Sequence, residues 1–143
     1  FETNSYRQEI MQRVARLGIA EQIEWVGFTE DVLSELAKMD LFALPSLFGE
    51  GLPMVVLEAM AAGVPVVGSR VEGVPEAIDD GINGLLTEPG DPVDLAEKLQ
   101  QIIDGELDWQ ALRDNAMNTH LDCFSDRSMA KGVAEVYRMV LDA

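Results

Sequence analysis

The sequence predicts an α/β fold in which a Rossmann-like parallel sheet is flanked by helices and followed by a helical C-terminal extension. The stretch Asp40–Ser69 has the order strand, glycine-containing loop, apolar helix and strand, which is typical of the crossover between parallel strands. A further short apolar run, Gly84–Thr87, follows a turn that contains glycine and asparagine. A chain of 143 residues, 48% of them hydrophobic, buries one ordinary core. We therefore expect one domain over residues 1–143, with an α/β core at 19–90 and a mainly helical part at 91–143.

Three elements are expected before the central stretch. They are a helix from Thr3 or Asn4 to Leu17, a strand at Ile23–Val26, and a second helix capped by Thr29 that runs through Lys38. The first helix has apolar residues at helical spacing, and the following Gly18 is a residue type that ends helices. The strand is a short run of β-branched and aromatic residues.

The central stretch has clear start and stop signals. Leu41–Leu44 is an apolar run closed by Pro45, and it predicts a strand buried on both faces of a parallel sheet. Pro53 suits the first position of the next helix, and Gly63 suits the residue just past its end. This helix is apolar nearly all round, so we expect it to be buried before Pro65–Val67 forms the next strand.

Two glutamates stand out in this apolar surrounding. Glu58 is the one charged residue of the helix, and no lysine or arginine occurs within Asp40–Ser69 to neutralise it. A buried carboxylate needs hydrogen-bond donors, whereas a glutamate on a solvated edge of the helix does not; both interpretations stay open at this point. Glu50 lies between Gly49 and Gly51, just before a helix N-terminus, where free backbone N–H groups attract anions and glycines allow close approach of a ligand.

The segment from Glu50 to Glu58, two glutamates with seven residues between them, resembles the signature of retaining glycosyltransferase family 4, also called glycosyl transferases group 1. Members of that family have the two-domain GT-B fold. The similarity continues, in the same order as in the family, through Ala43–Ser46, Glu58–Val67, Glu72–Glu76, Gly84–Leu86 and Pro89–Asp91. An ordered series of this kind within a strand–loop–helix context is far more specific than a glutamate pair alone. It covers residues 6 to 100 or so.

The resemblance implies a function for the chain. It would be the C-terminal, nucleotide-sugar-binding half of a GT-B enzyme that transfers a sugar from an NDP-sugar to an acceptor hydroxyl with retention, a hexosyltransferase of EC class 2.4. No cofactor and no metal are implied, because the NDP-sugar is a substrate.

The resemblance also implies roles for single residues. Glu50 is assigned to the transferred sugar as the catalytic residue, and Glu58 to the ribose hydroxyls. The other assigned donor-binding residues are Gly49, Gly51, Leu52 and Pro53 in the loop, and Val26 and Phe28 in a segment that lines the nucleobase pocket. For Phe28, a place in the hydrophobic core is an equally good interpretation.

The resemblance begins only after the first strands of the family's donor half, where an arginine and a lysine normally hold the diphosphate. We therefore expect a fragment truncated at its N-terminus that is not active alone. Its expected partners are the nucleotide-sugar and an N-terminal acceptor-binding domain.

The sequence after the central stretch predicts one more strand and several helices. The loop Gly68–Pro75 follows a strand and is expected beside Gly49–Gly51, because the carboxyl ends of parallel strands meet at one edge of the sheet. Within it, Arg70 either contacts an anion or lies on the surface.

The expected helices run from Pro75 to Asp80 or Gly81, from Asp91 or Pro92 to Ile103, from Trp109 to Leu121 and from Ser125 to Leu141. The apolar face of the second of these comprises Leu95, Leu99, Ile102 and Ile103. The last helix has a stripe of Ala130, Val133, Val136, Tyr137, Val140 and Leu141, and the resemblance suggests that it packs toward the other domain.

Composition excludes several classes of function. The formal net charge of −16 and a pI near 4.1 argue against binding to nucleic acid or to an anionic membrane surface. The one cysteine, Cys123, permits no internal disulfide, and the one histidine, His120, makes a zinc site a poor interpretation. No apolar run is long enough for a transmembrane segment, and no signal-like segment opens the chain. We expect a cytoplasmic location, with peripheral membrane attachment through the N-terminal domain left open.

Two alternatives to the transferase remain. A nucleotide-sugar epimerase of the same fold would act on the donor without an acceptor, and a non-catalytic docking module would not respond to nucleotides. A dehydrogenase is excluded because Gly49–Met54 begins like a dinucleotide fingerprint but lacks its third glycine. The donor sugar, base, acceptor and oligomeric state are left open by the sequence.

Overall fold

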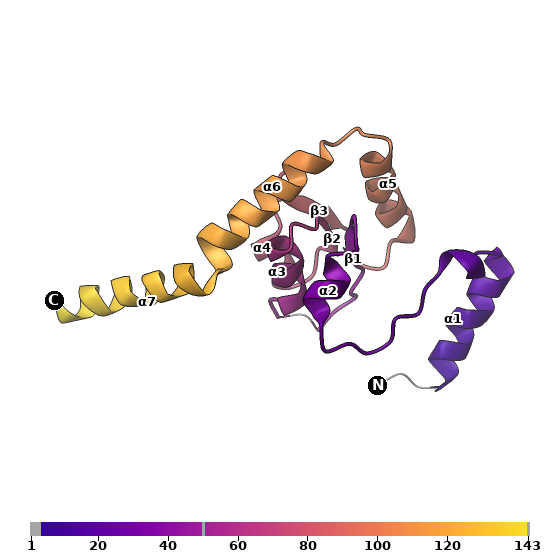
Figure 1. The fold of residues 1–143 in the computed structure, drawn as a ribbon, viewed down its shortest axis with the longest axis horizontal. Coiled ribbons are helices and arrows are strands. Elements are labelled where there is room, and N and C mark those ends of the chain that lie inside the picture. Colours follow the sequence, from indigo (N-terminus) through magenta and orange to yellow (C-terminus); the bar gives the residue numbers. More distant parts are fainter. Residues whose placement is uncertain (1–3, 50, 143) are drawn as a thin grey trace. The chain divides into compact units, whose positions relative to one another are not determined.

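The computed structural model describes residues 4–49 and 51–142, and it divides into two units between Glu30 and Asp31 (Figure 1). The smaller, N-terminal unit contains two helical elements. Among the described residues, the larger unit contains the sheet, six α-helices (α2 to α7) and a π-helical turn.

The N-terminal unit begins with helix α1 (Asn4–Leu17) and continues with a short 3-10 helix, η1 (Ala20–Gln22). The predicted end of α1 is confirmed, because Gly18 follows with a left-handed φ of 68°. The predicted strand at Ile23–Val26 is wrong. Ile23 has an extended backbone (φ −116°, ψ 122°), but this segment pairs with no strand of the described chain. An extended segment without a hydrogen-bonded neighbour is not a strand.

Helix α2 (Val32–Leu36) opens the larger unit. The sequence predicts Thr29 as its cap and Lys38 as its end, and both predictions are wrong. The cap is Asp31, whose carboxylate accepts hydrogen bonds from the Ser34 hydroxyl (2.6 Å) and from the Ser34 backbone N–H (3.1 Å). These two bonds, the hydroxyl's first, lower the pKa of Asp31 below its ordinary value.

Three parallel strands form one sheet in the order β1 (Phe42–Leu44), β2 (Val66–Ser69) and β3 (Gly84–Thr87). All three predicted strands of this region are therefore confirmed. Strands β2 and β3 are buried along their whole length. The prediction that the first strand is buried on both faces is wrong, because β1 lies at the edge of the sheet with Ala43 exposed.

Helix α3 (Met54–Ala61) connects β1 to β2. Pro53 is its N-cap (φ −70°, ψ 119°) rather than its first helical residue, and Gly63 follows the helix with φ 70° as expected. The helix is mostly buried, although Met54 at its start is 65% exposed. Gly63 is close to the side chains of Arg113 and Met117, each 2.9 Å from where a Cβ would lie, so a larger residue here would separate α3 from the helix that bears them.

The remaining helices follow the strands. Helix α4 (Val74–Ala77) contains Pro75 at its start and ends earlier than predicted, because Ile78 is already extended. The others are α5 (Pro92–Ile103), α6 (Trp109–Thr119), the π-helical turn η2 (His120–Phe124) and α7 (Asp126–Leu141). Ile103, predicted on the apolar face of α5, is instead 75% exposed at the helix end.

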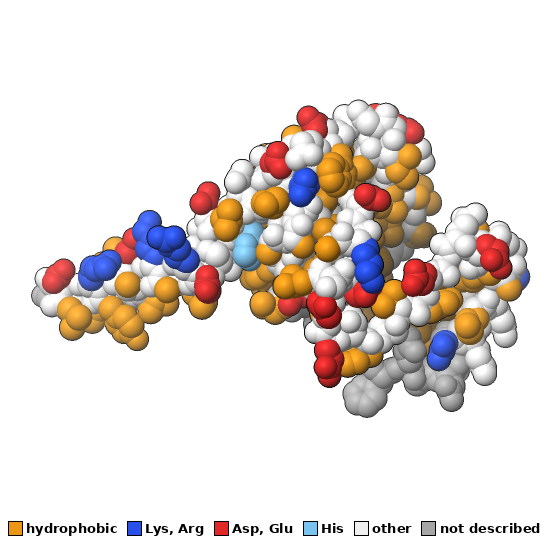
Figure 2. Space-filling view, viewed as in Figure 1, with side chains coloured by type: hydrophobic (Ala, Val, Ile, Leu, Met, Phe, Trp, Pro, Cys, Tyr) orange, Lys and Arg blue, Asp and Glu red, His pale blue; other side chains and the backbone are white. Residues whose placement is uncertain are grey.

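The hydrophobic core lies where α3 packs against the sheet and against its neighbouring helices. Its members are Leu36, Val56, Leu57, Ala59, Met60, Val64, Val66, Val71, Val74, Ala77, Ile78, Leu86 and Ala116. Helix α7 contributes none of these and extends away from the sheet (Figure 1). Figure 2 shows hydrophobic side chains along one side of α7 and Lys and Arg side chains along another.

The cap of α5 gives a test of the fold. The Asp91 carboxylate accepts hydrogen bonds from the backbone N–H groups of Val93 (2.9 Å) and Asp94 (3.1 Å). We expect Asp91→Ala to lower the free energy of unfolding by about 1 kcal/mol, because two helical N–H groups lose their acceptor. Urea unfolding followed by circular dichroism measures this. The control is Glu97→Ala on the exposed side of α5, which should change the free energy by less than about 0.5 kcal/mol; equal effects of the two substitutions would contradict the role of the cap.

Candidate functional site

Two loops meet at the carboxyl edge of the parallel sheet. One follows β1 and contains Gly49 and Gly51; the other follows β2 and contains Glu72 and Gly73. The Gly73 N–H donates to the Gly51 carbonyl oxygen at 3.1 Å, and the Gly49 N–H donates to Glu72 Oε1 at 3.3 Å. The sequence-based expectation that these loops lie side by side is therefore confirmed.

The approach of the loops depends on a glycine. A Cβ on Gly73 would lie 2.3 Å from the Gly51 carbonyl oxygen, a distance that no side chain tolerates. Position 73 must therefore be glycine for the loops to keep this contact. Glu72 beside it has φ 41°, a left-handed conformation that is unusual for a residue with a side chain.

Glu50, the predicted catalytic residue, lies outside the described residues. Its two neighbours Gly49 and Gly51 are both exposed to solvent. Leu52 is 36% exposed, whereas Pro53, the N-cap of α3, is buried. Among the described residues, no side chain caps this helix. The Val56 N–H donates to the Pro53 carbonyl oxygen at 3.0 Å, and no carboxylate of the described residues acts here as Asp91 does for α5.

Glu58 lies in the middle of α3 between the buried residues Leu57 and Ala59. The Glu58 side chain is itself half-buried. Within residues 4–49 and 51–142, no side chain or backbone N–H donates a hydrogen bond to its carboxylate, and no cation pairs with it. The carboxylate thus has unused acceptor capacity in a mostly apolar helix, which is a favourable arrangement for a ligand that presents hydroxyl groups.

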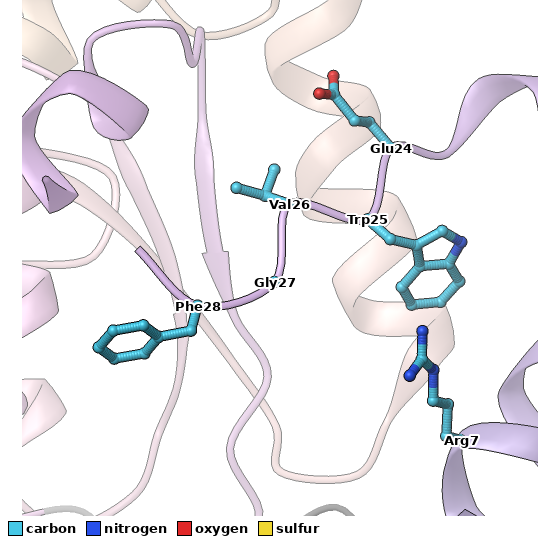
Figure 3. A pocket seen from close by; sticks show the side chains of 6 residues that line it. All are labelled: Arg7, Glu24, Trp25, Val26, Gly27 and Phe28. Carbon is cyan, nitrogen blue, oxygen red and sulfur yellow. The ribbon is translucent and has the colours of Figure 1, made fainter. Parts of the chain in front are cut away.

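Val26 and Phe28, predicted for the nucleobase pocket, belong to the N-terminal unit. They line an open pocket of about 510 Å³ together with Arg7, Glu24, Trp25 and Gly27. In Figure 3 the Arg7 side chain, from α1, points toward the Trp25 ring. Phe28 is 91% exposed and Val26 is 53% exposed, so the alternative that Phe28 belongs to the hydrophobic core is wrong for this unit.

Arg70, for which the sequence left an anion contact or a surface position open, is exposed in the structure. Its guanidinium pairs with Asp80 (3.3 Å) and Glu88 (3.7 Å). Asp80 also accepts a hydrogen bond from the Leu86 N–H at 2.9 Å and lies 3.8 Å from the Lys98 ammonium. This partly exposed cluster joins the ends of β2 and β3, and ion pairs at such exposure contribute little to stability.

The described residues contain no group of three or more His, Cys, Asp or Glu side chains that could hold a metal ion. None of the helices in the described part of the chain is long and apolar enough to cross a membrane.

Sequence reasoning missed one residue at this site. In the sequence, Glu72 stands out only as part of the run Glu72–Glu76 that resembles the family, and its contact with Gly49 is not visible in any local pattern. The signal that points to it is structural: a glutamate in a left-handed conformation, bonded to the loop that contains the predicted catalytic residue.

Comparisons with known proteins agree with this geometry. The chain is 38% identical over 108 residues to D-inositol 3-phosphate glycosyltransferase of Corynebacterium kroppenstedtii, a match that covers 76% of this chain and 24% of that protein. It is 33% identical over 132 residues to N-acetyl-alpha-D-glucosaminyl L-malate synthase of Bacillus anthracis, covering 92% of this chain and 34% of that protein. The chain thus spans about a quarter to a third of the length of the curated relatives it matches.

Solved structures are also similar to the chain. The crystal structure of Anabaena Alr3699/HepE in complex with UDP superposes with a TM-score of 0.87 at 30% sequence identity, covering 94% of this chain and 37% of that one. The complex of the same protein with UDP-glucose gives a TM-score of 0.86 at 29% identity, covering 97% and 38%. The predicted fold class is confirmed: the sheet and its helices are those of GT-B glycosyltransferases.

Residues 3–105 match the family described as glycosyl transferases group 1. This match covers more than half of the chain, and the chain therefore belongs to the glycosyl transferases group 1 family.

Proposed function

We propose that this chain binds the nucleotide-sugar donor of a retaining glycosyltransferase, which transfers a sugar from a UDP-sugar to an acceptor hydroxyl. The observation that carries the proposal is the half-buried Glu58 carboxylate, which has no donor among the described residues. The chain's family and its similarity to a protein seen with UDP and UDP-glucose support this choice of ligand.

The chemistry of the donor fits the residues of the larger unit. The ribose of a nucleotide presents O–H donors, and an ionised carboxylate is an acceptor for them. Glu58 would accept these bonds and so satisfy a charge that the apolar helix leaves without partners. The uncapped N-terminus of α3, which follows Gly51 and Leu52, offers N–H groups and a positive dipole end to the diphosphate.

Glu50 keeps the catalytic role that the resemblance implies. Transfer with retention develops positive charge on the sugar and negative charge on the leaving diphosphate. A carboxylate between Gly49 and Gly51 would stabilise the first, and the α3 N-terminus would stabilise the second. The nucleobase role that the resemblance implies for Val26 and Phe28 of the N-terminal unit stays a prediction.

Two further parts of the proposal concern what accompanies the chain. Acceptor binding is assigned to a separate N-terminal domain, as the family resemblance implies, and the chain's match to only part of its relatives is compatible with this. We also propose a cytoplasmic location, where nucleotide-sugars would be available to the protein.

The first test is calorimetric titration with UDP, GDP and ADP and with their sugar conjugates. We expect uridine ligands to bind, and Glu58→Ala to weaken that binding by about 1–3 kcal/mol, because a charged acceptor of ligand hydroxyls is lost. Glu97→Ala, which removes an exposed glutamate from α5, is the control and should bind like the wild type. Equal affinity of the Glu58→Ala variant and the wild type would refute the assignment of Glu58. A chain that binds no nucleotide at all would instead support the docking module.

The second test concerns metal ions. The proposal places no metal between protein and diphosphate, because the α3 N-terminus supplies the positive field. We therefore expect an excess of chelator to leave the affinity for UDP-glucose unchanged in the same titration. A loss of affinity that added Mg²⁺ or Mn²⁺ restores would contradict metal-independent binding.

A further inference from the structure

Glu72 has an unusual backbone conformation. Among the described residues, it is the one non-glycine residue with a positive φ (41°). A side chain in this region is sterically unfavourable, and such positions persist where the surrounding structure compensates. A glycine would adopt the same turn freely. The turn alone therefore does not explain a glutamate at this position.

The compensating interaction is a bond to the other loop. Glu72 Oε1 accepts a hydrogen bond from the Gly49 N–H at 3.3 Å, across 23 positions of sequence. Beside it, the Gly73 N–H donates to the Gly51 carbonyl oxygen at 3.1 Å. The two bonds hold the residues on either side of position 50, one through a side chain and one through the backbone.

The bond from Glu72 is not needed to keep the core together. Glu72 and Gly49 are both exposed, and neither belongs to the hydrophobic core cluster. Gly49 has φ 83°, and its N–H would be hydrated if Glu72 were absent. Glycine residues give a loop many accessible backbone conformations. A hydrogen bond from Gly49 to the Glu72 carboxylate reduces the number of conformations that the loop adopts.

We propose that Glu72 is a positioning residue for the donor sugar: by accepting a hydrogen bond from Gly49, it holds the backbone of the loop that follows β1 in place for sugar binding. This inference rests on the proposed function, in which the loop contacts the sugar and Glu58 contacts the nucleotide. If the hydrogen bond between Gly49 and Glu72 is lost, the affinity for UDP-glucose should fall, whereas the affinity for UDP, which lacks the sugar, should stay the same. The proposed function alone does not predict this difference.

The test uses three variants. Glu72→Gly removes the carboxylate and at the same time relieves the left-handed strain, so its thermal stability should equal or exceed that of the wild type. Glu72→Gln keeps an acceptor oxygen at a similar distance from the backbone but has no charge, so it should preserve the hydrogen bond from the Gly49 N–H. Glu76→Ala removes a nearby exposed glutamate on α4 that has no hydrogen bond or ion pair within the described part of the chain, and it is the control.

Two quantities are measured for each variant. The first is the hydrogen-exchange rate of the Gly49 amide by NMR without ligand, which should rise several-fold in Glu72→Gly and stay near the wild-type rate in the other two. The second is the affinity for UDP-glucose and for UDP. Glu72→Gly should weaken UDP-glucose about fivefold, as expected for one net hydrogen bond, and change UDP by less than about twofold.

Each contrary result overturns a defined part of the inference. If the exchange rate of the Gly49 amide is unchanged in Glu72→Gly, the hydrogen bond to Glu72 does not protect that amide in the wild type, even if the donor binds normally. Equal weakening of UDP and UDP-glucose shows a general structural role rather than sugar positioning. Failure of Glu72→Gln to restore sugar affinity shows that the charge acts on the ligand directly. If the wild type binds neither UDP nor UDP-glucose, the proposed function is wrong, and so is the role of Glu72 in positioning the sugar. The exchange rate of the Gly49 amide still tests the hydrogen bond to Glu72 in that case.

Discussion

The structure depends on the burial of strand β2, which pairs in parallel with β1 on one side and β3 on the other. Parallel pairing requires a crossover between successive strands, and the crossover helix α3 must then cover the sheet. This explains why α3 is apolar and why it lies in the core. It also explains why loops far apart in sequence meet, because every parallel strand ends at the same edge.

Glu58 makes the packing of α3 against the rest of the core less stable than an apolar residue would. An apolar residue at that position would extend the contacts of Leu57 and Ala59, and it would avoid partial desolvation of a carboxylate. Local choices that disagree with the fold are expected mainly at functional sites. Half-burial keeps the unfavourable free energy small, and the acceptor oxygens have no partner among the residues that the structure describes. Glu72 presents a similar conflict at the level of the backbone, since its side chain is retained where glycine would relax the turn.

Local signals allowed much of this fold to be predicted from the sequence. Asp91 caps the start of α5 and Gly18 ends α1, and both signals act within a few residues. The apolar segments that form β2 and β3 are wholly buried. The failures arise where tertiary context decides. The segment Ile23–Val26 has strand-forming residues but no neighbour to pair with. At the site, the place of Glu58 in a buried helix was predictable from Pro53, Gly63 and the apolar residues between them, although the burial of Glu58 itself was left open. The bond from Gly49 to Glu72 requires a loop contact that no sequence pattern describes.

Helix α7 shows how local and tertiary stabilisation differ. Its start is stabilised by Ser125, whose hydroxyl accepts from the Ser128 N–H at 3.1 Å, and by contact with η2. Beyond that, the large residues of its predicted apolar stripe are 51–82% exposed: Val133, Val136, Tyr137, Val140 and Leu141. An isolated helix of 16 residues is marginal in water, because tertiary packing of the apolar face supplies most helical stability. The far end of α7 therefore gains its full stability only when the stripe is covered. Packing toward a second domain, as the family resemblance suggests, would cover it.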